Sequence, residues 1–429
     1  MLGADHGAVT ARMAPGRRDA SISFTPTPVS ASRPRLVRAS AGAAALLGLS
    51  LGVLGSASGA AAAEWIVGGS VSQRFEADTN ADLEEDGEAI YGATTALGLD
   101  FTALTPTTQW QVETGASVGA FGGSGDREGR NRLNPNFAAA VDHNGKYIDT
   151  GASFAFDMQP ASVAQLEETG ITEGDATQVS VRLAADAAYA LDARNRLNLG
   201  GFGRVIRFTR GETTLEPTTT YGTDLAWIRD LSAVTQGSLS FGARRFTADG
   251  AEGRKSLIFD LSAGVGHLVN RRLSVDASLG VSATRTNRTE AGERETEFDI
   301  GAIGGLDVAW VPAADTTLIF ALSHGLEPNS TGELRTTTAM GVGLQHALNS
   351  WASAAIDVFV QRQSSGGGIE DEEQSDRTFA SIAPGLAFTL TPDWALRAGY
   401  ALDLEREDDS DALSNRFFLT ITRQFDILP

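Results

Sequence analysis

The stretch RRLSVDASLGVSATR, residues 271–285, decides the fold, because from Leu273 onward the character of its side chains changes at every position. Alternate positions from 273 are apolar: Leu273, Val275, Ala277, Leu279, Val281 and Ala283. The positions between them are polar or very small: Ser274, Asp276, Ser278, Gly280, Ser282 and Thr284. Successive side chains of a β-strand point to opposite faces, so this period of two predicts a strand with one apolar face and one polar face.

The same alternation recurs in other segments of the chain. It runs from Leu257 to Val265 and again from Trp394 to Leu404. Soluble β-sandwiches alternate in the same way, so the period leaves open whether water or lipid touches the apolar face.

The lengths of the connections between these segments distinguish the two cases. Eight connections are short and lie near 105–108, 142–146, 192–195, 230–236, 269–272, 312–316, 347–350 and 391–393. Nine longer, mostly acidic connections lie near 78–88, 122–134, 159–178, 210–217, 247–255, 285–297, 327–335, 364–376 and 405–415. Because short and long alternate, all turns fall at one rim and all loops at the other. This predicts an all-β fold, a transmembrane antiparallel up-and-down β-barrel of about 18 strands with short periplasmic turns and long extracellular loops.

The positions of the tryptophans give evidence that does not depend on the count of turns and loops. Five tryptophans flank short turns and one lies at the start of the first strand: Trp110, Trp227, Trp310, Trp351, Trp394 and Trp65. Tryptophan is enriched in the headgroup layer of membranes, so the six predict a periplasmic aromatic girdle. The alternative is that they anchor the core of a soluble sheet.

The first 63 residues differ from the rest. Arg33, Arg35 and Arg38 precede an apolar run of small residues that ends in Ala61–Ala63, the pattern of a cleaved secretory signal. We therefore expect residues 1–63 to be a leader with a signal peptide and residues 64–429 to form the barrel. A retained anchor helix and an over-extended start are the alternatives.

Composition excludes several classes of protein. The chain has no cysteine, which rules out disulfides and thiol chemistry. Its formal net charge of −20 disfavours nucleic acid as a partner. Acidic segments at 82–86 and 370–373 are candidates for binding cations that bridge lipopolysaccharide phosphates, although such runs are more often simply solvated. We expect the protein to lie in the bacterial outer membrane, with lipid and lipopolysaccharide as its partners.

The charged residues opposite the apolar faces are candidates for lining a pore. They comprise twelve acids and five arginines: Arg74, Glu76, Asp100, Glu113, Asp149, Arg182, Asp186, Asp224, Arg244, Asp260, Asp276, Asp299, Asp307, Asp357, Arg397, Asp403 and Arg416. One interpretation is a conduit that favours cations; the other is that these charges pair across strands and stiffen the wall.

No catalytic, metal or cofactor site is predicted. Calcium-loop, closely spaced histidine and phosphate-loop motifs are missing from the sequence. Of the histidines after residue 63, three fall near short turns, and His324, beside Ser323, is the remaining candidate for a hydrolase. We expect a protein that is not an enzyme, with a barrel hydrolase as the weakest alternative.

The segment VSQRFEADTN, residues 71–80, resembles the first strand of the type 2 β-barrel porins of proteobacteria. The hairpin array that follows, through Phe425, extends the resemblance over most of the chain. The amphipathic last strand also resembles the signal that outer-membrane proteins present to the barrel-assembly machinery. The resemblance implies a channel linked with exopolysaccharide export and a periplasmic polysaccharide-export partner, or a conduit for small solutes. A plugged barrel that acts in structure or adhesion through its loops, such as 159–178, is the alternative.

Overall fold

The computed structural model describes residues 64–81, 83, 87–124, 131, 133–161, 163–164, 176–209, 215–249, 253–290, 293–328, 334–365, 376–407 and 410–428. The predicted leader and signal peptide (1–63) and most of the acidic segments at 82–86 and 370–373 lie outside these residues. Among the described residues, no helix is long and apolar enough to cross a membrane.

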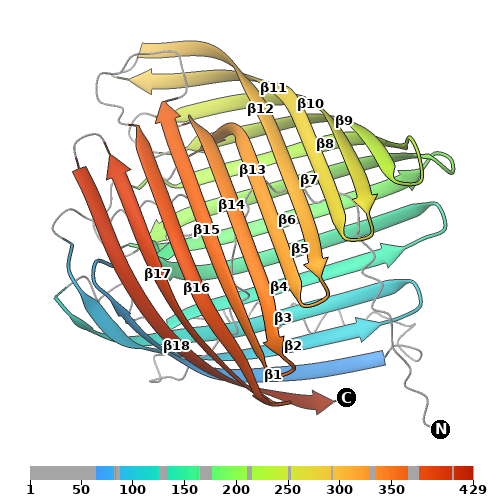
Figure 1. Cartoon of the computed structure of the whole chain (residues 1–429). Coiled ribbons are helices and arrows are strands. Elements are labelled where there is room, and N and C mark those ends of the chain that lie inside the picture. Colours follow the sequence, from blue (N-terminus) through green and yellow to red (C-terminus); the bar gives the residue numbers. More distant parts are fainter. Residues whose placement is uncertain are drawn as a thin grey trace, which may run out of the picture.

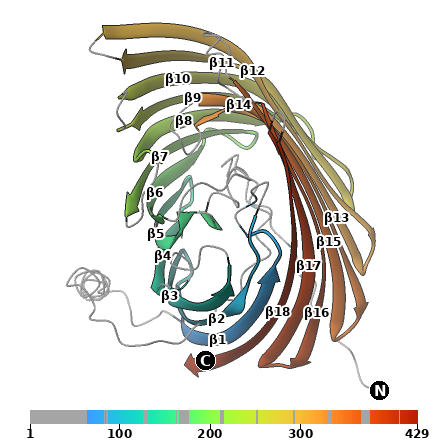
Figure 2. The ribbon, with the colours of Figure 1, turned by 90° about the vertical axis from the view of Figure 1, so that its left-hand side faces the viewer.

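Eighteen strands make one antiparallel sheet that closes on itself (Figures 1 and 2). Each strand pairs with its neighbours in sequence, and β1 pairs with β18 from Gly68–Asp426 to Asp78–Arg416. The strands are β1 (Glu64–Asp78), β2 (Ile90–Leu104), β3 (Thr108–Gly123), β4 (Leu133–Asn144), β5 (Ile148–Pro160), β6 (Thr177–Ala190), β7 (Asn195–Thr209), β8 (Thr218–Asp230), β9 (Thr235–Ala248), β10 (Arg254–Asn270), β11 (Leu273–Glu290), β12 (Glu293–Ala313), β13 (Thr316–Pro328), β14 (Leu334–Asn349), β15 (Ala352–Ser365), β16 (Arg377–Thr391), β17 (Trp394–Glu407) and β18 (Ser410–Leu428). The predicted fold and strand number are confirmed.

Two of the nine predicted long loops are wrong. Residues 285–297 belong mostly to β11 and β12, whose ladder continues to Glu290–Glu293, and residues 405–415 belong mostly to β17 and β18, paired up to Glu407–Ser410. Their charged and polar side chains resemble loop composition. At the rim of a barrel, however, both faces of a strand can meet water, so polarity there does not end the strand. The β11–β12 hairpin projects beyond its neighbours on the side of the long loops (Figure 1).

Alternation along each strand separates an outer face from an inner one. The most exposed large side chains lie on the outer face, among them Ile300 (78%), Phe298 (73%) and Leu279 (73%). Closure of the sheet through β1 and β18 leaves no free edge strand, so such a barrel can carry apolar side chains outward within a bilayer.

Candidate functional site

The inner face of the barrel carries the charged residues that the sequence singled out. In every strand the register places these seventeen on the face opposite the exposed apolar side chains, as for Asp276 against Leu279 on β11. Eight of the seventeen are exposed and nine are half-buried or buried. The acids of the first group lie toward the short turns, and most of the second group lies toward the long loops. Arg182, nearer the long-loop end of its strand, and Asp357 and Arg397, nearer the short-turn ends of theirs, depart from this division.

The exposed group forms what we call the acidic vestibule. It consists of seven acids, Asp100, Glu113, Asp149, Asp186, Asp224, Asp276 and Asp307, to which Arg182 adds one positive charge. Each acid lies within six residues of the short-turn end of its strand. The sequence analysis missed further inward acids at this rim, including Asp142 and Asp426, which the alternation along β4 and β18 would have found.

Two pairs of vestibule acids lie directly opposite one another. Asp100 faces Glu113 across β2 and β3, and Asp276 faces Asp307 across β11 and β12. Like charges at directly opposed positions destabilise a sheet, and water in the lumen only reduces that repulsion. Folding therefore does not explain why these acids are here.

Glycines on neighbouring strands make room for the vestibule carboxylates. A Cβ added at Gly68 would lie 2.3 Å from Asp100 Oδ2, and one added at Gly200 would lie 2.4 Å from Asp224 Oδ2. Gly151 stands in the same relation to Asp186, and Gly266 to Asp276. The carboxylates thus lie along the wall, over the glycines of the neighbouring strand.

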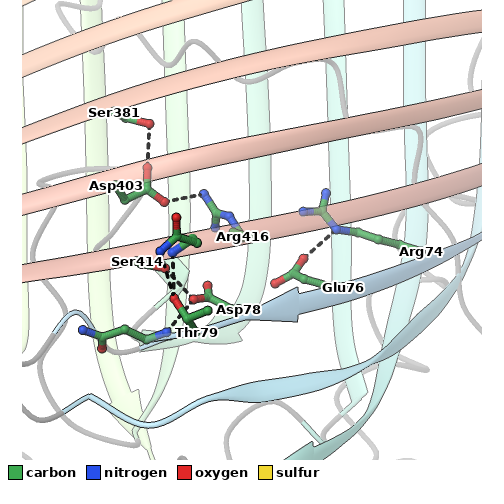
Figure 3. Close-up of polar contacts among 10 residues, drawn as sticks. Arg74, Glu76, Asp78, Thr79, Ser381, Asp403, Ser414 and Arg416 are labelled. Carbon is green, nitrogen blue, oxygen red and sulfur yellow. Dashed lines mark hydrogen bonds and ion pairs between the residues drawn. The ribbon is translucent and has the colours of Figure 1, made fainter.

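In the long-loop half, charges on the inner wall pair with one another (Figure 3). Arg74 Nε lies 2.7 Å from Glu76 Oε2 on β1, and Arg416 Nη2 on β18 lies 3.1 Å from Asp403 Oδ2 on β17. Ser381 Oγ donates a further hydrogen bond of 2.6 Å to Asp403, whose side chain is 2% exposed. Here the alternative interpretation of the sequence, pairing that stiffens the wall, describes the contacts.

The sequence analysis missed the most buried of these ion pairs. Arg377 Nε on β16 lies 2.6 Å from Glu405 Oε1 on β17, and Arg377 also bonds Glu407. Glu405 follows Leu404 on the polar side of the alternation from Trp394, but it also begins the predicted loop 405–415, and it was not counted among the lining candidates. Glu407 was assigned to that loop.

The connection between β1 and β2 turns into the barrel. Leu83, in a positive-φ conformation (φ 50°), packs against Phe379 of β16 and Ala412 of β18, with Phe359 of β15 beside them. Asp78 accepts a hydrogen bond from Ser414 Oγ, and Thr79 N donates to Asn415 O at 3.1 Å. We call the described residues of this connection, 79–81, 83 and 87–89, the inward loop. Leu83 takes up part of the lumen in the long-loop half, so we call that half, with its paired charges, the narrow zone.

The tryptophans all lie at the short-turn end of the barrel. Trp110, Trp227, Trp310 and Trp394 are on the outer face, between 38% and 44% exposed, and Trp351 lies in the β14–β15 turn. Trp65 packs against Phe101 of β2, with ring centroids 5.1 Å apart and the ring planes tilted by 49°. This is the arrangement that a headgroup girdle requires.

His324, the candidate catalytic residue of a hydrolase, lies on the outer face. His324 Nδ1 is 2.8 Å from Thr338 Oγ1 of β14. The other three bond threonines near short turns, as His143 does with Thr108 at 2.9 Å. The part of the chain that the structure describes holds no group of three potential metal ligands.

A closed antiparallel barrel with an apolar outer face and a polar, charged lumen is the architecture of bacterial outer-membrane proteins. The chain is an outer-membrane β-barrel.

Comparisons with known proteins add likenesses of fold. No family model matches the chain, so its resemblance to the type 2 porins stays a prediction, and no curated protein matches it. Among solved structures, OccAB4 of Acinetobacter baumannii matches at 10% identity over 84% of this chain and 98% of its own, with a TM-score of 0.45. OprD of Pseudomonas aeruginosa matches at 12% identity over 86% and 98%, with a TM-score of 0.43. The ferric citrate transporter FecA matches at 9% identity over 79% of this chain, with a TM-score of 0.46, and this chain covers 60% of it.

Proposed function

We propose that the protein is a passive outer-membrane channel for small hydrophilic solutes and that it favours cations. The observation that carries the proposal is the acidic vestibule, in which seven exposed acids face one exposed arginine among the predicted lining residues. A lumen lined by one sign of charge and walled by low-dielectric material concentrates ions of the opposite sign.

The acidic vestibule and the narrow zone would select solutes by different properties. The paired charges Arg74–Glu76 and Arg416–Asp403 cancel within each pair, and Arg377 offsets one of its two partners, Glu405 and Glu407. Together these groups leave a single net negative charge in the narrow zone, against the net charge of −6 of the vestibule. The inward loop there limits the size of a solute. Selection by charge then falls to the vestibule, and selection by size to the long-loop half.

Exopolysaccharide export, which the family resemblance implies, has less support. An acidic vestibule repels an acidic polymer, and the inward loop, fixed by Asp78, Thr79 and Leu83, lies where a polymer would have to pass. A periplasmic export partner therefore stays a prediction of the resemblance alone.

A plugged barrel that acts through its extracellular surface is the second candidate. The packing of Leu83 and the projecting β11–β12 hairpin favour it. The two candidates differ in whether ions pass. For a hydrolase, His324 is poorly placed, because it lies on the outer face and its Nδ1 bonds the Thr338 hydroxyl rather than an acid.

Conductance of the purified protein in a planar bilayer tests the proposal. Under a tenfold KCl gradient we expect steady channels whose reversal potential has the sign of potassium selectivity. Channels that prefer chloride would refute the assignment to cations. A barrel that stays closed, also after deletion of residues 82–86 from the inward loop, would favour the plugged alternative.

A further inference from the structure

Three exposed cations lie together on the outer face of the barrel, at its long-loop end. Arg245 of β9 and Arg285 of β11 are paired directly opposite Leu257 of β10, one on each side. Lys255 lies two residues from Leu257 on the same strand, so its side chain points to the same face. We call Arg245, Lys255 and Arg285, all of them exposed, the basic triad.

The basic triad is compact enough to hold a single anion. Two strand spacings of about 4.8 Å separate Arg245 from Arg285, and Lys255 is a diagonal neighbour of both, about 7–8 Å away. Long side chains meet across such distances. The three charged groups can therefore reach one anion that lies over Leu257.

Other arginines on the outer face of this rim have acid partners. These are Arg207 with Asp249 at 3.5 Å, Arg362 with Asp376 at 2.7 Å and Arg406 with Asp411 at 3.5 Å. Among the described residues, no carboxylate pairs with the basic triad, and Arg285 instead lies over the Phe298 ring at 5.5 Å. Like charges repel one another and a cation beside hydrocarbon does not stabilise a barrel, so an anion from outside the chain would complete the site.

Height along the wall places the basic triad at the outer edge of the hydrocarbon. A strand rises about 3.3 Å per residue and tilts by about 40°, so each residue climbs about 2.5 Å along the membrane normal. Arg245 lies ten residues above Thr235, the first residue of β9, and Arg285 lies twelve above Leu273, the first of β11. These intervals put the two arginines about 25 and 30 Å from the short turns, where an apolar band of about 25 Å ends.

The surroundings of the basic triad are apolar on one side and polar on the other. Toward the short turns lie exposed Phe259 and Ile300, the latter 78% exposed. Toward the long loops, Thr247 of β9 and Asn287 of β11 are paired on either side of Lys255. Asn287 Oδ1 accepts a hydrogen bond of 3.0 Å from Thr296, which leaves the Asn287 amide donors for a ligand. A ligand here would combine acyl chains, an anionic group and hydroxyls.

We propose that the basic triad binds a phosphate of a phosphorylated glycolipid of the outer leaflet, a lipid of the lipopolysaccharide kind. Arginine forks bind phosphate through paired hydrogen bonds, and Lys255 would add a point charge. Thr247 and Asn287 would bond hydroxyls of the sugar that carries the phosphate, and the acyl chains would lie against Phe259 and Ile300. The contact needs no bridging cation and does not depend on whether ions pass through the barrel.

Binding of lipid A, the diphosphorylated glycolipid anchor of lipopolysaccharide, to the purified barrel tests the proposal. The detergent-solubilised protein is titrated with lipid A and the bound lipid is counted by native mass spectrometry. Arg245→Gln/Arg285→Gln removes two cations of the triad. Arg362→Gln/Arg406→Gln is the matched control, because those arginines lie on either side of Thr378 of β16 in the same way, but already pair with carboxylates.

Each cation near an anionic lipid surface contributes about fivefold to binding. We therefore expect lipid A to bind the triad variant about 25-fold more weakly than the wild type, and the control variant about as tightly as the wild type. Lys255→Gln should weaken binding about fivefold by itself. Equal affinities of the wild type and the triad variant would overturn the proposal, as would equal weakening in the triad and control variants, which would mean that only overall charge matters.

The choice of lipid separates the possible ligands. Lipid A stripped of both phosphates should bind the wild type about as weakly as intact lipid A binds the triad variant. Phosphatidylglycerol, an anionic lipid without a sugar, should bind more weakly than lipid A. Equal binding of either lipid and of intact lipid A would overturn the assignment to a glycolipid phosphate. Binding of lipid A that EDTA abolishes would overturn it too, since cations held by acidic segments would then form the bridge.

A photocrosslink locates the bound lipid. The chain has no cysteine, so Leu257→Cys and Thr378→Cys can each carry a benzophenone at a single position between two arginines. We expect several times more crosslink to lipid A from position 257 than from position 378, and equal yields would contradict the site. Cation conductance should be unchanged in the triad variant, so failure of the channel proposal and failure of this one are distinguishable.

Discussion

Replacing Asp100 by Asn and Glu113 by Gln removes two of the seven vestibule carboxylates and barely changes side-chain size. These two acids lie directly opposite one another on β2 and β3, so the change also relieves a like-charge pair and should not destabilise the barrel. The expected result is a channel that conducts as before but discriminates less between cations and anions.

The size of the effect follows from screened Coulomb energies. A unit charge about 10 Å from a permeating ion, in water and 0.1 M salt, contributes about 0.15 kcal/mol. The seven acids and Arg182 carry a net charge of −6. They would favour a cation by about 0.9 kcal/mol and disfavour an anion equally, a permeability ratio of about 20. With a net charge of −4 the ratio falls to about 8.

Reversal potentials of single channels in a KCl gradient measure this ratio. Asp249→Asn/Asp411→Asn is the matched control, because it removes two exposed acids that lie at the long-loop end instead. At 1 M salt, where the Debye length is about 3 Å, both double variants and the wild type should approach a ratio of about 1. A wild-type ratio that stays high at 1 M salt, or a vestibule variant as selective as the wild type, would refute the reasoning.

Three other changes test the wall and the inward loop. Gly280→Ala should destabilise the barrel by about 1–3 kcal/mol, because the new Cβ would lie 2.3 Å from a backbone oxygen. Gly203→Ala, which has open space at its Cβ, is the control and should be close to neutral. Equal unfolding midpoints of the two variants in urea would contradict this expectation. Ser414→Ala removes a donor to buried Asp78 and should cost about 1–3 kcal/mol in the same assay; an unchanged midpoint would mean that the contact does not stabilise the fold. Leu83→Gly relieves the positive φ but removes the packing of the inward loop, so we expect larger or noisier single-channel currents, and identical currents would show that the loop does not narrow the lumen.

The strand array was predictable because two physical constraints repeat along the chain. Lipid outside and water inside impose a period of two, and the two rims impose alternating connection lengths, so all eight predicted turns fall between strands. The same alternation identified which face carries Asp100, Asp276 and Arg416.

Contacts between distant strands were not predictable in the same way. Arg244 reaches the Leu326 carbonyl where β13 is no longer paired with β12, and Leu83 reaches Phe379 because the inward loop turns into the barrel. Both depend on the curvature of the closed sheet, which a local pattern does not contain. Which inner charges are exposed to the lumen and which are buried has the same origin, since it depends on what packs against each part of the wall.

Contact of the outer face with hydrocarbon is the claim on which the rest depends, and the six tryptophans report on it, because all lie at one rim. The direct measurement is fluorescence quenching of the reconstituted protein by lipids brominated at different depths of the acyl chain. We predict the strongest quenching by bromines nearest the headgroup and little by those at the bilayer centre. Strongest quenching at the centre, or none at any depth, would contradict the placement of this barrel in the membrane.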